Sequence, residues 1–177
     1  GNVVVVRMSS FHGGLRLDQP VGALMVAPYP LPTRTGLLAV TFVAAGALFA
    51  AAFGFGVIHL IRRTGSSLTL AIMAGVAAVQ AIVESVRSLF PYTYPFHVWR
   101  LSGIWVLAAA FSILLVSYAA SRFFPRARRT LTGVAAAAVG ATLLIPGFDF
   151  KTGGALLIGA GMAAIIAAAA VRLRRPG

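Results

Sequence analysis

Five long apolar segments, separated by short stretches that carry arginine or lysine, constrain this chain more than any other feature. They run over about 36–61, 66–90, 101–124, 130–145 and 153–171. A helix needs about 17–25 mostly apolar residues to cross the hydrocarbon core of a bilayer. The fourth segment stops at Pro146-Gly147 and is the shortest of the five. The sequence therefore predicts an all-α polytopic membrane bundle of about five transmembrane helices over residues 36–177.

Arginine is distributed unevenly between the two ends of these segments. One set of loops and the C-terminal stretch carry Arg62, Arg63, Arg122, Arg126, Arg128, Arg129, Arg172, Arg174 and Arg175. The opposite side carries Arg34, Arg87, Arg100 and Lys151 close to the helices. Short loops rich in Lys and Arg stay in the cytoplasm. We therefore expect an integral protein of a bacterial inner membrane, with its N-terminus outside, its C-terminus inside and the lipid bilayer as its main partner.

The formal net charge of +12 raises the question of nucleic acid as a partner. The arginines, however, follow the ends of apolar runs and do not form a solvated basic face, which phosphate-backbone binding requires. Nucleic-acid binding is therefore excluded.

Residues 1–35 differ from the rest of the chain. Val3–Val6 and Val21–Ala27 have the composition of buried strands, and paired glycines at Gly13-Gly14 suit a turn between them. A proline-rich connector, 29–32, follows. Two strands alone are not stable in water. We therefore expect a short β-strand remnant at the end of an extracellular or periplasmic β-sandwich, within a longer protein.

The stretch from Gln80 to Arg100 concentrates the polar residues next to hydrocarbon. Gln80, Glu84 and Arg87 lie at i, i+4 and i+7 and so share one helix face. One interpretation is a buried polar relay that also involves His97 and Arg100. The other is an ion pair of Glu84 with Arg87 or Arg100 that anchors the outer helix end, which is favoured because snorkelling near a helix end costs little.

The aromatic residues of this stretch are expected in a loop between the second and third helices. They are Tyr92, Tyr94, Phe96 and Trp99, accompanied by Pro91 and Pro95. Tyr and Trp are typical of the membrane–water interface. The alternative is an outer lid that contacts the external domain.

No catalytic or cofactor-binding constellation is evident. The chain has no cysteine, and its three acids, Asp18, Glu84 and Asp149, offer no carboxylate pair. His59 and His97 are expected at opposite helix ends and cannot share a metal. Asp149 and Lys151 are expected in a solvated outer loop. We expect no cofactor or metal, and no enzymatic activity in this segment by itself.

Small residues recur every four positions in three segments. The stripes are Gly46, Ala50, Gly54; Gly133, Ala137, Ala141; and Ala155, Gly159, Ala163. Such stripes allow close helix packing in a membrane. An alanine-rich composition also produces them by chance, and the sequence leaves both explanations open.

The order of these features resembles a known family. A terminal strand reading GNVVVVRMSS, an HGGL turn, a proline-rich connector and a helical membrane domain are similar to the bacterial seven-transmembrane receptors with diverse intracellular signalling modules. The stretch VQAIVESVRSLFPYTYPFHVWRLSGI resembles the second and third helices of members that end in a diguanylate cyclase or histidine kinase. The resemblance implies a carbohydrate-binding type of external domain and a cytoplasmic output domain. The chain departs from the family in showing five helices where the family has seven.

The sequence is consistent with three functions. The first is the membrane-embedded sensor portion of a receptor, with a small-molecule or carbohydrate ligand on the external domain and a homodimer as a further partner. The second is a small transporter or channel subunit, which needs polar residues along a path at mid-depth. The third is a structural membrane anchor for the external domain.

Overall fold

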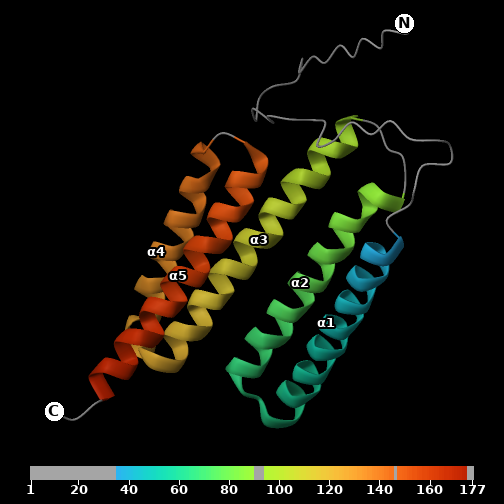
Figure 1. The fold of residues 1–177 in the computed structure, drawn as a ribbon. Coiled ribbons are helices and arrows are strands. Elements are labelled where there is room, and N and C mark those ends of the chain that lie inside the picture. The colour runs from blue at the N-terminus through green and yellow to red at the C-terminus, as the bar shows by residue number, and fades with distance from the viewer. Residues whose placement is uncertain (1–34, 90–93, 146, 175–177) are drawn as a thin grey trace, which may run out of the picture.

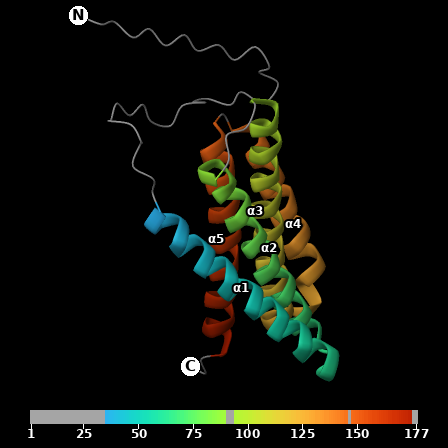
Figure 2. The same cartoon turned by 90° about the vertical axis from the view of Figure 1, so that its right-hand side faces the viewer.

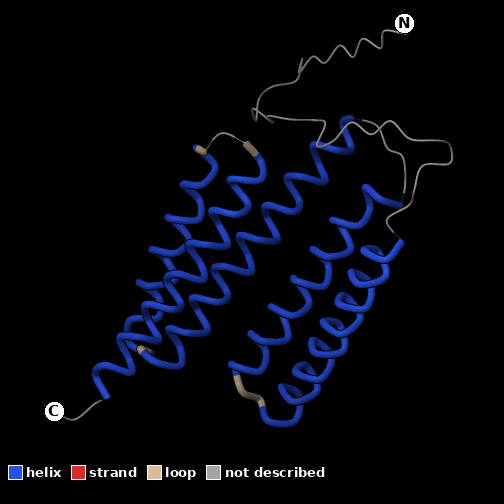
Figure 3. The backbone as a smooth tube through the Cα atoms, viewed as in Figure 1, coloured by secondary structure: helices blue, strands red, loops and turns tan. Residues whose placement is uncertain are grey.

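The computed structural model of this chain describes residues 35–89, 94–145 and 147–174. Five α-helices fill these ranges: α1 (Thr35–Arg62), α2 (Gly65–Leu89), α3 (Tyr94–Phe123), α4 (Arg128–Ala141) and α5 (Phe148–Arg174) (Figures 1 and 3). Two short 3-10 helices, η2 (Pro125–Ala127) and η3 (Thr142–Leu144), flank α4. The prediction of a helical bundle with five helices is confirmed, but four of them, not five, are long and apolar enough to cross a membrane, and the described ranges contain no strand. The predicted β-strand remnant lies in 1–34, outside the described residues.

The helices run alternately up and down and form two groups. The hairpin of α1 and α2 makes one group, and α3, α4 and α5 make the other, with α3 in contact with α2, α4 and α5. Among the described helices, α1 packs against α2 alone, and it crosses that helix at a visible tilt (Figure 2). The contact between α2 and α3 therefore joins the two groups.

Four of the helices are long and apolar enough to cross a membrane. The apolar spans are Leu38–Arg62, Gly65–Val86, Phe96–Phe123 and Phe150–Leu173. Large apolar side chains point outward from them, including Phe53 at 76% exposure and Leu157 at 75%. An apolar surface of this kind fits lipid better than water, so the fold fits an integral membrane protein. α4 has 14 residues and is about 21 Å long at 1.5 Å per residue, shorter than the roughly 30 Å hydrocarbon core.

Small side chains fill the interior of the second group. One cluster between α3, α4 and α5 comprises Val116, Ala119, Ala120, Ala135 and Ile166, and a second comprises Ala109, Val139 and Ala155. Because alanine projects only one methyl group, the three backbones can approach closely, which is the usual packing mode in membranes.

Of the three predicted small-residue stripes, only the one in α5 lies in a helix interface. Ala155 and Gly159 are buried, and Ala163 packs against the first cluster. The stripe of α1 (Gly46, Ala50, Gly54) and that of α4 (Gly133, Ala137, Ala141) are exposed. Four-residue spacing alone therefore did not identify the packed faces.

Two predicted loops are helical in the structure. α3 begins at Tyr94, so Tyr94, Phe96 and Trp99 belong to a helix and the expected aromatic loop is wrong for them. Pro95 does not prevent this, because proline is tolerated in the first helical turn, where its missing N–H has no intrahelical partner.

The second correction concerns the expected outer loop at Asp149 and Lys151. α5 begins at Phe148, directly after Gly147, whose carbonyl accepts a hydrogen bond from Lys151 N at 3.2 Å. Gly147 has a φ of +82°, and a Cβ there would lie 3.1 Å from Phe150 Cδ2. Glycine makes this turn possible, and Lys151, expected in solvent, is buried with 7% exposure.

Candidate functional site at the end of α2

Arg100 connects the two helix groups. It lies on α3, its side chain is 9% exposed, and its Nη1 donates hydrogen bonds to the backbone oxygens of Val83 and Glu84, both at 3.3 Å. These carbonyls lie one turn before the last turn of α2, which ends at Leu89. A buried guanidinium on α3 is therefore hydrogen-bonded to the backbone of a neighbouring helix near its C-terminal end.

Gln80 and Glu84 extend this polar site along α2. Gln80 Nε2 donates to Glu84 Oε1 at 3.2 Å across one turn, as the i, i+4 spacing allows. The Glu84 side chain is exposed, and Arg100 reaches this residue through its backbone carbonyl. Charge-assisted donation to these two carbonyls helps to orient Arg100 against α2.

The other residues predicted for this site lie around it. His97 is half-buried on α3, three residues before Arg100. Arg87 lies in the last turn of α2, but its side chain is outside the described part, as is that of Tyr94. Trp99 is 77% exposed on α3, and Tyr92 lies outside the described residues. The structure thus brings Gln80, Glu84 and Arg100 together.

The predicted basic anchors gather at the opposite end of the bundle, where α1, α3 and α5 end and α4 begins (Figure 1). The anchors with described side chains are all exposed: Arg62, Arg63, Arg126, Arg128, Arg129 and Arg172. Arg174 ends α5, its side chain is not described, and Arg175 lies outside the described residues. The two described cations at the other end, Arg100 and Lys151, are buried. The described cations are therefore exposed at one end of the bundle and buried at the other.

A hydrogen bond between α3 and η3 was missed by sequence reasoning. Trp105 Nε1 donates to Thr142 Oγ1 at 3.1 Å, and the Thr142 hydroxyl donates to Val139 O at 2.6 Å. An indole N–H in an apolar helix calls for an acceptor, which is a signal the sequence offers. The acceptor lies 37 residues away, so the pairing depends on helix packing.

No protein family, curated protein or solved structure matches this chain. The resemblance to seven-transmembrane receptors therefore remains a prediction.

Proposed function

We propose that this chain is the membrane-embedded part of a bacterial signalling receptor, similar to the seven-transmembrane receptors with intracellular signalling modules. It relays an extracytoplasmic signal, received before α1, to a cytoplasmic output domain of diguanylate cyclase or histidine kinase type. The observation that carries this proposal is the Arg100 link: one buried side chain on α3 holds the end of α2. The arginine bias supports an orientation with the basic end in the cytoplasm.

The relay works through the arrangement of the two helix groups. The proline-rich connector precedes α1, and α1 packs on α2. A change in the external domain moves the α1–α2 hairpin, and the hairpin acts on α3 at the Arg100 contact. Signalling then requires two arrangements of the groups that the external domain stabilises to different extents.

Two of the buried hydroxyl groups are bonded within the protein, which supports a relay over a transport path, whereas those of Thr132 and Thr152 are buried without a hydrogen-bond partner among the described residues. The buried hydroxyl of Ser112 donates to the backbone carbonyl of Ala108, and that of Thr142 donates to the carbonyl of Val139, in each case about one turn earlier. These bonds satisfy hydroxyls in an apolar interior, whereas a conducting path needs polar groups that a solute can contact.

The test begins with the gene beyond the codon for Gly177. The proposal expects two further apolar segments and then a soluble signalling domain. The output of that domain, nucleotide cyclisation or autophosphorylation, is then compared between the wild type and a full-length variant whose residues 29–34 are replaced by a Gly/Ser linker.

The proposal expects the linker variant to lose its response to the external domain while keeping its expression and membrane insertion. An immediate stop codon, or an unchanged response with the flexible linker, would contradict a relay. Solute flux through the purified protein in liposomes would favour a transporter.

A further inference from the structure

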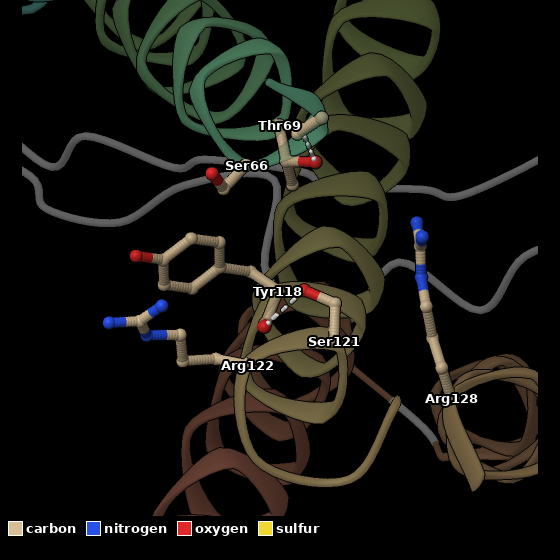
Figure 4. A pocket seen from close by; sticks show the side chains of 7 residues that line it. Ser66, Thr69, Tyr118, Ser121, Arg122 and Arg128 are labelled. Carbon is tan, nitrogen blue, oxygen red and sulfur yellow. Dashed lines mark hydrogen bonds between the residues drawn. The ribbon is translucent and has the colours of Figure 1, made fainter. Parts of the chain in front are cut away.

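A polar pocket of about 280 Å³ lies at the basic end of the bundle, away from the Arg100 site. It is lined by Gly65, Ser66, Thr69, Tyr118, Ser121, Arg122 and Arg128 (Figure 4). These residues come from the start of α2, the end of α3 and the start of α4. Three helix ends that meet only in the folded chain therefore build this pocket.

The two arginines line different sides of the pocket. In Figure 4, Arg122 lies with Tyr118 on one side of Ser121, and Arg128 lies on the other side. Arg128 Nε donates to Ser117 Oγ at 3.2 Å, which fixes the start of that side chain on α3 and leaves its Nη groups for a ligand. Both side chains are exposed, so they can turn toward a bound group.

The hydroxyls divide into two kinds. Those of Thr69 and Ser121 donate to the carbonyls of Gly65 and Tyr118, at 3.0 and 2.7 Å, so their protons are engaged. Ser66 and Tyr118 also line the pocket, and their hydroxyl groups are further donors for a ligand. The first turn of α2 adds backbone N–H groups that have no intrahelical acceptor.

The charge of this pocket is positive. Arg122 and Arg128 each carry a full charge, and the N-terminus of α2 adds about half a positive charge. Glu84, the acid whose side chain is described, lies near the opposite end of α2. An oxyanion with several acceptor oxygens matches this set of donors better than a neutral or cationic ligand, and guanidinium binds phosphate in a bidentate manner.

We propose that this pocket binds a phosphate group, through Arg122 and Arg128 with the Tyr118 hydroxyl and the N-terminal turn of α2. The group comes either from an anionic lipid headgroup at the cytoplasmic surface or from a phosphate-bearing solute. Basic pockets between helices on that side of a membrane suit anionic headgroups. A bound phosphate joins α2 to α3 and α4, and so fixes the hairpin at the end opposite Arg100.

The experiment has two arms, both on the full chain. In the first, the detergent-solubilised protein is titrated with phosphatidylglycerol or with phosphatidylcholine, and bound lipid is counted by native mass spectrometry. In the second, inorganic phosphate is titrated onto the protein in phosphatidylcholine nanodiscs and binding is measured by calorimetry. Each arm compares the wild type with Arg122→Gln/Arg128→Gln, with Tyr118→Phe and with Arg172→Gln, a control at the same end of the bundle but outside the pocket lining.

We expect the double variant to weaken binding at least tenfold, Tyr118→Phe to weaken it about threefold, and Arg172→Gln to change it less than twofold. If the double variant weakens only the binding of phosphatidylglycerol, the ligand is a lipid headgroup. If it weakens the binding of inorganic phosphate, the ligand is a phosphate-bearing solute. Either result supports the site. An equal loss in Arg172→Gln would show that general surface charge is responsible. That result, or no binding by the wild type in either arm, overturns the proposal.

Discussion

Gly159 of α5 lies so close to Ser112 of α3 that a side chain cannot be added to it without movement. A Cβ at position 159 would be 2.5 Å from Ser112 Cβ and 2.8 Å from Ser112 Cα. Real side chains do not approach that closely, so the absence of a Cβ sets the distance between α3 and α5. Ser112 is 1% exposed, with its hydroxyl bonded to Ala108 O, and cannot turn aside freely.

Gly159→Ala is therefore expected to destabilise the bundle by about 1–3 kcal/mol, the usual cost of overpacking an interior. Thermal unfolding in detergent measures this. Gly161→Ala is the matched control, because a Cβ there meets no atom within 4 Å, and it should be neutral or stabilising by up to about 1 kcal/mol from helix propensity. Equal effects of the two variants would contradict the close contact.

Trp105→Phe should weaken the contact between α3 and η3. The variant removes the donor to Thr142 Oγ1 while an aromatic ring remains, and the loss of one such bond costs about 0.5–1.5 kcal/mol. Trp99→Phe is the control, since Trp99 is 77% exposed and should change the midpoint of unfolding little. A larger shift for Trp99→Phe than for Trp105→Phe would count against this contact.

Arg63→Gly should stabilise the turn between α1 and α2. Arg63 has a φ of 52° just after α1, and its N–H bonds to His59 O at 2.7 Å, the geometry in which helices usually end on glycine. Relief of the left-handed conformation contributes about 1 kcal/mol. Unfolding in detergent should shift upward, with Arg62→Gly, in the last turn of the helix, shifting it downward. A downward shift for Arg63→Gly would contradict the turn geometry.

The sequence predicted the helices better than their ends and contacts. Apolar runs identified the five helices, four of which are long enough to cross a membrane. The starts of α3 and α5 were misplaced by several residues, since Pro95 and Gly147 read as loop signals but stand at or just before a first helical turn. The burial of Lys151 depends on how neighbouring helices pack, which no local pattern reports.

In the polar site, too, the sequence predicted the contact within one helix but not the contacts between helices. The i, i+4 spacing placed Gln80 and Glu84 on one face, and their side chains are hydrogen-bonded. Two partners of Arg100 are backbone carbonyls. Every residue has a carbonyl, so residue type gives no indication of which ones an arginine on another helix will reach.

The central claim is that two helix groups, linked through Arg100, change their arrangement with the state of the region before α1. The chain has no cysteine, so spin labels can be placed by Val43→Cys and Leu157→Cys, at exposed positions on α1 and α5. Double electron–electron resonance in nanodiscs then gives the distribution of distances between the two labels in the full chain. We expect two populations of distances, and their ratio should shift when residues 29–34 are replaced by a Gly/Ser linker. Arg100→Met should broaden the distribution, whereas Arg172→Gln should not. A single distribution that none of these changes alters would contradict the central claim.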